Sequence, residues 1–527
     1  CWQSDDKECI IWFGEEDQLR IMAMKKGTKL NEVFNKLKEL LDTFESIEGI
    51  TFAKSEKYGY VTSCPSNLGT GMRASVHVKV PNLTSDGTDA KAKEICKPLG
   101  LSVRGTGGEH TPIGADGTVD ISPSARLFIK ECEIISKLYQ GIKDLMEAEK
   151  AAAPVLDFSD ATWKLIDSMK TSHPGNRCTK YLSKEYYDSL AADDQATFRR
   201  CVMTGIENVD SGLGCYAMKP ADYETFAPFF DQIIQDYHNG TADSKHETDW
   251  DISGVGEGGV LDVTQLGLSE LSMRVRVGRN LTAFNLPGLM DRAERIKFEK
   301  TLLPAFDKIK EKMGGCIYSL SPDWGEGEAN PNLIDEAKYN ELVKAHVMFK
   351  DMDADPYLKS AGISSDWPYG RGCWQSDDKE CIIWFGEEDQ LRIMAMKKGT
   401  KLNEVFNKLK ELLDTFESIE GITFAKSEKY GYVTSCPSNL GTGMRASVHV
   451  KVPNLTSDGT DAKAKEICKP LGLSVRGTGG EHTPIGADGT VDISPSARLF
   501  IKECEIISKL YQGIKDLMEA EKAAAPA

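Results

Sequence analysis

An exact internal repeat constrains the fold of this chain more than any other feature of its sequence. Residues 1–154 recur without a change as residues 373–526, and residues 155–372 lie unrepeated between the two copies. Solenoid repeats are shorter and diverge, so identity over this length indicates a recent duplication or a tandem gene product. Because residues 155–527 have the order of one complete unit, we expect residues 1–154 to be the back part of a preceding unit.

The two copies have the same chemistry, so either could pack against residues 155–372. The C-terminal copy is connected to this segment in the usual order, and we expect it to take that place. In this sequence, no equivalent of residues 155–372 precedes the N-terminal copy. We therefore predict that it is catalytically silent when alone.

The charge and cysteine usage of the chain exclude several classes of partner. Its formal net charge is −17, which repels nucleic acid and anionic membranes, and we expect neither as a partner. No run of 18 or more apolar residues occurs, which argues against a membrane span. The 14 cysteines are scattered without a CxxC pair, as is typical of free thiols in a reducing compartment. We expect a cytoplasmic protein.

Hydrophobic periodicity predicts both helices and strands in the C-terminal copy. Apolar residues at helical spacing predict a helix over residues 402–416, which Gly421 would end, and Ser494-Pro495 is typical of the start of another helix. The predicted strands are Glu380–Phe385, Leu391–Met396, Gly431–Cys436 and Ala446–Val452. Residues 155–260 are rich in helical patterns, and we expect a smaller, mostly α-helical domain there.

Five arginines lie in settings that suit the binding of phosphate. Arg274 and Arg276 alternate with apolar residues, so a strand would present both from one face, and Arg445 lies on another predicted strand. Arg392 follows an acidic cluster, and Arg476 opens a glycine-rich loop whose backbone can close over phosphates. Guanidinium groups bind phosphate oxygens in bidentate geometry. In an acidic protein, this set predicts a site for phosphoryl transfer, which needs neutralised charge and aligned reactants.

The usual nucleotide-binding signatures are missing from the sequence. It contains no GxxxxGK[ST] motif and no HRD or DFG set of the protein kinases. Residues 254–259 fit G-x-G-x-x-G, but no convincing strand precedes them and no helix start follows. We therefore interpret them as an interdomain loop.

Several longer motifs point to one family. Residues 436–442 have the sequence CPSNLGT, residues 384–392 WFGEEDQLR and residues 476–483 RGTGGEHT, with shorter matches RVR at 274–276 and ASVH at 446–449. These stretches resemble the signatures of the phosphagen kinases, which transfer a phosphoryl group between ATP and a guanidino compound. The resemblance covers essentially all of the chain after the first copy.

The resemblance implies an α+β fold with two domains in the complete unit. A small all-α N-terminal domain would span residues 155–260, and a larger catalytic domain with an antiparallel β-sheet flanked by helices would span residues 261–527. Residues 1–154 would be a truncated duplicate of the catalytic domain. We expect a monomeric kinase unit.

The resemblance also implies a binding site for ATP and ADP, with Mg²⁺ held through the phosphates and without a direct protein ligand. The implied ATP-binding residues are Ser272, Arg274, Arg276, His346, Arg392, Arg445, Ser447, His449, Arg476, Gly477, Thr478, Gly479 and Gly480.

A further part of the resemblance concerns the guanidino substrate. The loop of Ser211, Gly212, Leu213, Gly214, Cys215 and Tyr216 is similar to the N-domain loop that lines the amino-acid end of the site in arginine kinases. Glu388 and Glu481 match the carboxylates that hold the guanidinium, and Cys436 matches the thiolate beside it. We expect the two carboxylates to align the substrate rather than to act as bases. We also expect nearby cations to lower the pKa of Cys436. The implied catalytic residues are Glu388, Cys436, Glu481, Arg276 and Arg392.

The loop and the carboxylates favour L-arginine as the substrate. Gly479 stands where arginine kinases usually have a second arginine, as in creatine kinases, whereas Glu481-His482 departs from the creatine kinase pattern. A kinase for another guanidine, such as taurocyamine, is therefore the alternative. Bacterial protein-arginine kinases also resemble the catalytic domain, but they lack the helical N-terminal domain and rank third.

The N-terminal copy repeats part of this set without equivalents of Arg274, Arg276 or the N-domain loop. Its incomplete set is Glu16, Arg20, Cys64, Arg73, His77, Arg104 and Glu109.

Overall fold

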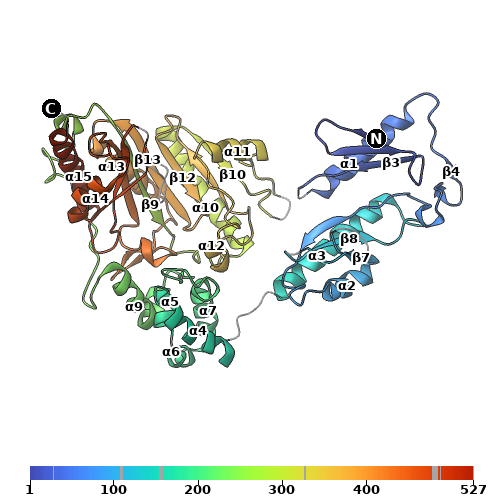
Figure 1. Cartoon of the computed structure of the whole chain (residues 1–527), viewed down its shortest axis with the longest axis horizontal. Coiled ribbons are helices and arrows are strands. Elements are labelled where there is room, and N and C mark those ends of the chain that lie inside the picture. Colours follow the sequence, from blue (N-terminus) through green and yellow to red (C-terminus); the bar gives the residue numbers. More distant parts are fainter. Residues whose placement is uncertain are drawn as a thin grey trace. The chain divides into compact units, whose positions relative to one another are not determined.

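The computed structural model describes residues 1–27, 29–106, 111–114, 116–152, 158–325, 328–477, 485–486 and 488–525. The chain forms two compact units, Cys1–Asp157 and Phe158–Ala527 (Figure 1). Among the described residues, no helix combines the length and the apolar character that a membrane crossing requires.

The second unit begins with a helical part, as the sequence predicts. Its helices are α4 (Asp160–Ser172), α5 (Arg177–Tyr181), α6 (Lys184–Ser189), α7 (Ala192–Glu207), α8 (Asp222–Thr225) and α9 (Ala227–His238). Aromatic side chains fill the space between them: the ring of Phe198 packs edge to face on Phe226 and Phe229, with centroids 5.1 and 5.0 Å apart. This core holds the short helices around the loop that contains Ser211 to Tyr216.

The larger part of the second unit is built on one eight-stranded sheet in which every pair of neighbours is antiparallel. In spatial order, its strands are β10 (Cys316–Ser319), β11 (Gly372–Gln375), β12 (Cys381–Phe385), β13 (Leu391–Gly399), β9 (Leu271–Arg279), β16 (Met444–Lys451), β18 (Thr490–Pro495) and β17 (Leu473–Arg476).

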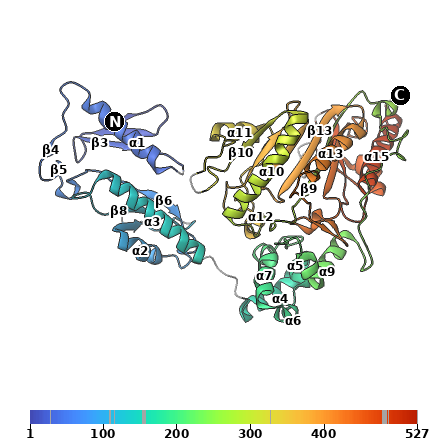
Figure 2. The same ribbon diagram turned by 180° about the vertical axis from the view of Figure 1, so that it is seen from behind.

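Helices cover one face of this sheet. They are α10 (Arg292–Met313), α13 (Leu402–Glu417), α14 (Ala462–Cys468) and α15 (Glu503–Ala523), and Figures 1 and 2 show α10 and α13 side by side against the strands. Two further helices, α11 (Glu336–Lys344) and α12 (Pro356–Ser360), lie in the segment between β10 and β11. Since helices bury the apolar face, the opposite face is left for polar side chains.

Strand β9 is the centre of the sheet, although it comes from the unrepeated segment. It pairs with β13 on one side and with β16 on the other, and both of these strands belong to the C-terminal copy. Its apolar residues Met273, Val275 and Val277 are buried, whereas Arg274 and Arg276 point to the other face. The C-terminal copy therefore packs against the unrepeated segment, as we expected.

In the first unit, the same sequence forms two separate three-stranded sheets. One consists of β1 (Trp2–Gln3), β2 (Cys9–Phe13) and β3 (Leu19–Ala23). The other consists of β6 (Val76–Lys79), β8 (Thr118–Pro123) and β7 (Leu101–Arg104). The hairpin β4 (Lys54–Ser55) and β5 (Gly59–Tyr60) and the helices α1 (Leu30–Glu45), α2 (Ala90–Cys96) and α3 (Glu131–Ala152) complete this unit. The sheet is divided at the position that β9 occupies in the second unit.

Two of the predicted elements were wrong. Ser494-Pro495 does not start a helix: Thr490–Pro495 is β18, a buried strand between β16 and β17, and α15 begins only at Glu503. The predicted strand Gly431–Cys436 is limited to β15 (Gly431–Tyr432), which pairs with β14 (Lys426–Ser427). The following peptide groups bond instead to groups outside a ladder, for example the amide of Ser435 to Asp389.

Candidate functional site

The polar face of the central strands gathers the phosphate-binding candidates. The cross-strand pairs between β9 and β16 are Arg276 with Arg445, Arg274 with Ser447, and Ser272 with His449. Burial lowers the pKa of Arg276, and the neighbouring guanidinium groups of Arg392, Arg274 and Arg445 lower it further. Four arginines thus share one partly buried patch. An anion with several negative charges, such as a polyphosphate, would relieve their mutual repulsion.

One carboxylate on this face was missed by the sequence analysis. Asp492 of β18 lies opposite both His449 and Arg476, and its Oδ1 is 3.8 Å from Nε2 of His449. Burial raises the pKa of Asp492, while His449 and Arg445 act in the opposite direction. The alternation of Val491, Asp492 and Ile493 was the available signal. It was hidden because the neighbouring Ser494-Pro495 suggested a helix start.

Arg392 is held by the acidic turn between β12 and β13. Its Nη1 donates to Oε1 of Glu387 at 3.0 Å, and its Nη2 lies 2.8 Å from Oε2 of the same carboxylate. The carboxylate of Glu388 is 3.6 Å from this guanidinium, and the guanidinium carbon lies 5.4 Å from the ring centroid of Trp384. The bidentate ion pair and the aromatic ring fix the orientation of Arg392 beside Arg276.

Glu388 is a largely buried carboxyl group with two other carboxyl groups as neighbours. Burial and the nearby Asp389 and Glu387 raise its pKa to about 7, although Arg392 acts against them. Its Oε2 accepts a hydrogen bond from Nδ2 of Asn439 at 3.3 Å. A guanidinium cation placed here would stabilise the ionised form, so the site fits a cationic, planar substrate.

Cys436 lies beside Glu388, but its expected low pKa was wrong for this structure. Burial raises the pKa of the thiol to about 12, and the charge of Glu388 adds to this effect. The Sγ atom lies 3.1 Å from Oγ of Ser438. The sequence prediction counted the nearby arginines and did not account for burial and the adjacent carboxylate, which both favour the neutral thiol.

The helical part of the unit contributes Tyr216 to the same place. The amide of the next residue, Ala217, donates to the carbonyl oxygen of Ser435 at 2.8 Å, which places Tyr216 beside Cys436. Burial raises the pKa of its phenol, and the charges of Cys436 and Glu388 add to this effect. The loop before it is held from behind: the carbonyls of Gly212 and Leu213 accept hydrogen bonds from α5. Gly214 has a φ of +72°, and a Cβ atom there would lie 2.7 Å from the Cα of Gly205, so only glycine fits.

In the duplicate, the described residues include Cys64, Arg73, His77 and Arg104. The remaining predicted residues fall into two groups. Ser211 is buried in the loop and Gly477 is buried at the end of β17, whereas His346 is exposed, next to Val347, whose carbonyl accepts a hydrogen bond from Nε1 of Trp384. The others lie outside the described residues. These are Thr478, Gly479, Gly480, Glu481 and, in the duplicate, Glu109.

A second residue that the sequence analysis missed is Arg498. Its Nη1 donates to the carbonyl oxygen of Ser438 at 3.2 Å. Burial lowers its pKa, whereas the charges of Cys436 and Glu388 raise it. It is therefore a cation at the carboxylate end of the site. No motif singled it out, because it follows β18 in a stretch that was assigned to a helix.

In the duplicate, the same acidic turn is exposed. Arg20 lies 2.7 Å from Glu15 and 3.6 Å from Glu16, close to the distances in the second unit. The three side chains are 40–44% exposed, compared with 15–18% for Arg392, Glu387 and Glu388. Exposed pairs are screened by water and contribute little. The duplicate thus keeps the local geometry of the site without its burial.

We predict that replacing Glu388 by glutamine stabilises the ligand-free protein at alkaline pH. Because the pKa is raised to about 7 from an ordinary value of 4.5, the ionised carboxylate costs stability progressively as the pH rises through this interval. Near pH 4.5, the variant and the parent protein should have the same free energy of unfolding. At pH 8, the free energy of unfolding of the variant should be higher by about 1–3 kcal/mol. Denaturant unfolding at several pH values measures this difference.

The matched control for this prediction is Glu16→Gln in the duplicate. Its side chain is 43% exposed, so the substitution should leave the pH dependence of unfolding unchanged. A Glu388→Gln variant that follows the parent protein at every pH would show that the carboxylate is not strained by its surroundings.

Comparisons with known proteins agree with this geometry. Residues 1–152 and 307–524 match the family ATP:guanido phosphotransferase, C-terminal catalytic domain, and residues 172–235 match the N-terminal domain of the same family. An arginine kinase of Anthopleura japonica is 36% identical over 533 residues, which cover 99% of this chain and 70% of that protein. A taurocyamine kinase of Schistosoma mansoni is 36% identical over 534 residues, which cover 98% of this chain and 67% of that protein.

A solved structure gives the same result. The duplicated taurocyamine kinase from Schistosoma mansoni with bound transition state analog components has a TM-score of 0.58 and 34% sequence identity, over 99% of this chain and 71% of that one. The chain therefore belongs to the phosphagen kinase family, the ATP:guanidino phosphotransferases. Like that structure, it is a duplicated protein, and its second unit has the family's helical N-terminal part followed by the sheet.

Proposed function

We propose that this protein is an arginine kinase, which transfers the γ-phosphoryl group of ATP reversibly to the guanidinium of L-arginine and gives phosphoarginine and ADP. The observation that carries the proposal is the meeting of two oppositely charged groups of residues on one face. Arg274, Arg276 and Arg445 form a cationic patch, and the largely buried Glu388 lies beside it, 3.6 Å from Arg392, with Tyr216 close by.

Different residues would hold the two substrates and stabilise the charge that moves during the reaction. A guanidino nitrogen of the substrate forms a bond to the γ-phosphorus, the bond from this phosphorus to the β–γ bridging oxygen breaks, and ADP leaves. The guanidinium loses one proton to solvent or to a carboxylate. Glu388 holds the guanidinium in line, and the arginines stabilise the charge that moves onto the phosphate oxygens. Glu481 would be the second carboxylate of this clamp, and Arg476 and His449 would contact the nucleotide.

Magnesium enters the proposal only with the nucleotide. Mg²⁺ would arrive with ATP and would neutralise part of the charge of its phosphates. The donor set on the polar face is rich in guanidinium groups, which repel a bare cation and attract an anionic complex. We therefore assign no direct protein ligand to the metal. We also propose that the kinase unit is monomeric and cytoplasmic.

A kinase for taurocyamine is the second candidate. The relative and the solved structure from Schistosoma mansoni favour it, since both are taurocyamine kinases and match nearly the whole chain. The two substrates differ at the end away from the guanidine, where arginine has a carboxylate and an amine and taurocyamine has a sulfonate. The loop of residues 211–216 is the part of the site that would distinguish them. A protein-arginine kinase ranks third, because the helical part is present.

The proposal is tested by measuring ADP release by the full chain with Mg-ATP and L-arginine, taurocyamine or creatine, beside a control without guanidine. We expect L-arginine to give the highest kcat/KM. Arg392→Ala should lower this value by about 10²–10³-fold, because one charged contact to the transition state is lost. The duplicate offers a matched variant, Arg20→Ala, which should leave the rate unchanged.

Two outcomes would contradict parts of this proposal. A higher kcat/KM with taurocyamine than with L-arginine would mean that taurocyamine is the substrate. The proposed phosphoryl transfer from ATP would still hold. Equal losses in the Arg20→Ala and Arg392→Ala variants would mean that both copies contribute to one site, contrary to our assignment of the activity to the second unit.

A further inference from the structure

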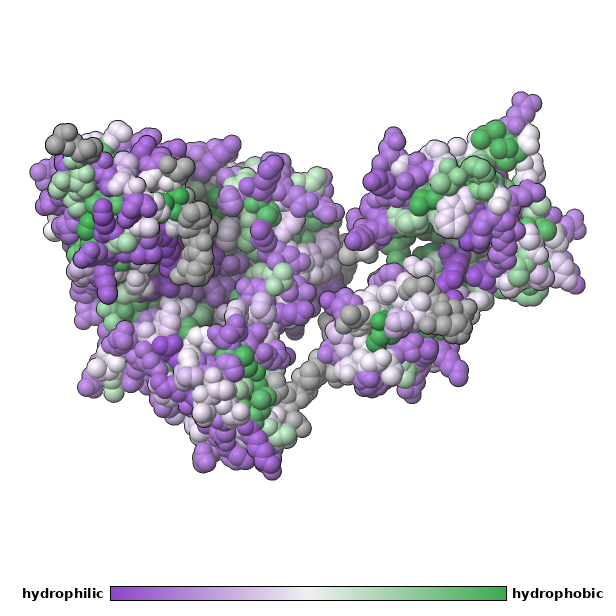
Figure 3. Space-filling view, viewed as in Figure 1, coloured by the Kyte–Doolittle hydropathy of each residue, from purple (hydrophilic) through white to green (hydrophobic). Residues whose placement is uncertain are grey.

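The repeat provides an internal comparison, because each of residues 1–154 has an identical counterpart among residues 373–526. Helix α1 has no buried residue, whereas the identical helix α13 buries eight, Leu409 among them. Trp2 is 49% exposed and its counterpart Trp374 is 0% exposed, and Phe13 is 67% exposed while Phe385 is 0% exposed. Figure 3 shows hydrophobic side chains on the surface of the first unit around α1 and β3. What differs is the cover that residues 155–372 provide, including Trp250, whose ring centroid lies 4.9 Å from that of Phe406 on α13.

The strand ends show where a missing strand belongs. β13 continues to Gly399 along β9, but its counterpart β3 stops at Ala23, the equivalent of Ala395. β16 starts at Met444 along β9, but its counterpart β6 starts only at Val76, the equivalent of Val448. Each strand is thus shorter by four residues at one end, and in the second unit these residues, 396–399 and 444–447, pair with β9. Within the described residues, β3 and β6 are edge strands of separate sheets.

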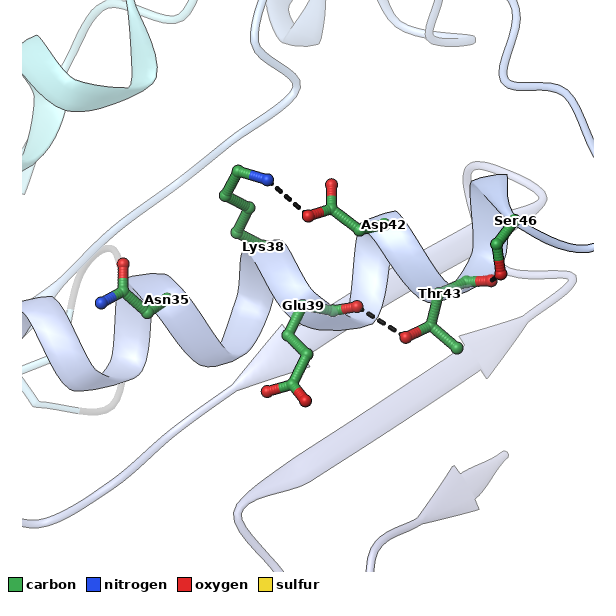
Figure 4. A pocket seen from close by; sticks show the side chains of 6 residues that line it. All are labelled: Asn35, Lys38, Glu39, Asp42, Thr43 and Ser46. Carbon is green, nitrogen blue, oxygen red and sulfur yellow. Dashed lines mark hydrogen bonds and ion pairs between the residues drawn. The ribbon is translucent and has the colours of Figure 1, made fainter.

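The outer side of α1 shows where a missing helix belongs. A surface pocket there is lined by Asn35, Lys38, Glu39, Asp42, Thr43 and Ser46 (Figure 4). The six counterparts on α13 line a pocket of the second unit that is completed by Lys308 and Lys312 of α10. Lys308 donates to Ser418 at 2.8 Å, and Lys312 donates to Thr415 at 3.4 Å. The polar groups that α10 uses on α13 are therefore present and exposed on α1.

We propose that the first unit is a docking surface for a polypeptide with the sequence of residues 155–372. We call this surface the open face; it consists of the edges of β3 and β6, the exposed side of α1 and the side chains of Trp2 and Phe13. A strand like β9 pairs with β3 and β6 and joins the two sheets into one. A helix like α10 lies along α1, and a strand like β10 covers β1 as it covers β11 in the second unit.

The chemistry of the open face favours this occupant over an arbitrary apolar partner. The backbone of an edge strand can pair with any other strand. A strand docked between β3 and β6, however, must place apolar residues on the core face of the sheet and can place arginines on the polar face. Residues 271–279 have that pattern, and they make this pairing with an identical surface in the second unit. Docking would also place two further arginines beside Arg20 and Arg73 and complete a second set of site residues.

The experiment uses the full chain extended at its N-terminus by an additional copy of residues 155–372. Hydrogen exchange followed by mass spectrometry is well suited to it, because peptides from the two copies have the same mass. In the original chain, peptides from α1/α13 and from β3/β13 should show two isotope envelopes of equal area, one fast and one slow. In the extended chain they should merge into one slow envelope, with exchange of the fast population slowed at least about 10-fold.

A variant of the extended chain supplies the control. Val275 is 2% exposed on the apolar side of β9, and Val275→Asp in the added copy alone should prevent docking and restore the two envelopes. Two envelopes in the unsubstituted extended chain would overturn the proposal. A single slow envelope in the original chain, together with a dimer in sedimentation, would also overturn it, because a second copy of the chain would then cover the open face.

Activity gives an independent readout that rests on the proposed function. With Arg445→Ala in the C-terminal copy, the original chain should lose arginine-dependent ADP release and the extended chain should retain it. Merged envelopes without ADP release in the extended chain carrying no substitution would disprove the proposed reaction and leave the docking intact. Two envelopes together with normal release in that chain would disprove the docking alone.

Discussion

Replacing Arg276 by methionine should lower kcat/KM for arginine-dependent ADP release by about 10³-fold or more, because the side chain neutralises charge on the transferred phosphoryl group. The same change should leave the Tm equal or higher. Burial and three neighbouring guanidinium groups lower the pKa of Arg276, which means that its charge is unfavourable in the free protein. Methionine has a similar length and packs among apolar side chains without that charge.

Steady-state kinetics and a thermal melt of the same preparation measure both effects. Arg200→Met is the control, since Arg200 is exposed on α7, away from the sheet. It should change neither value. A variant of Arg276 that is both inactive and strongly destabilised would indicate a structural role for this arginine and would contradict its assignment to phosphate binding.

The second large effect concerns the two identical leucines Leu409 and Leu37. Leu409 is 0% exposed in the core beneath the sheet, so Leu409→Ala should destabilise the second unit by about 3 kcal/mol. Leu37 is only half-buried on α1, and Leu37→Ala should cost less than about 1 kcal/mol. The temperature at which kinase activity is lost on heating reports on the second unit. It should fall by roughly 6–12 °C for Leu409→Ala and stay unchanged for Leu37→Ala.

These two variants carry the same substitution in the same local sequence. An equal fall of this temperature for Leu37→Ala would mean that the first copy also packs in the active unit, where α1 would be covered as α13 is. Such a result would contradict the exposure of the first unit and, with it, the existence of an open face.

The alternation of charged and apolar residues allowed much of the sheet to be predicted from the sequence. Arg274 and Arg276 lie on the polar face of β9, and the predicted strands 380–385 and 391–396 correspond to β12 and β13. Local patterns succeed here because each strand has one face on the core. Ser494-Pro495 misled the prediction because proline is tolerated at the end of a strand as well as at the start of a helix.

Properties that depend on the surroundings of a residue could not be predicted in this way. The pKa of Cys436 is raised by burial and by the carboxylate of Glu388 from the turn between β12 and β13, and neither is visible in its local sequence. Arg498 and Asp492 contact the site only through the folding of β16, β17 and β18 into one sheet. Helices α1 and α13 are the clearest case, since one sequence has two environments. The periodicity predicts an apolar stripe and cannot say whether anything covers it.

The central position of β9 has a consequence for the order of events during translation. Residues 1–154 leave the ribosome first, then the segment with β9, and the C-terminal copy only afterwards; at about 5–20 residues per second, this last stretch takes roughly 8–30 s to emerge. During that interval the nascent chain offers β9 an identical partner that is already complete. The pairing of β9 with the later copy is therefore not decided by the order of synthesis. For β9 to pair with the later copy, either it does not pair with the first copy during this interval, or that earlier pairing dissociates.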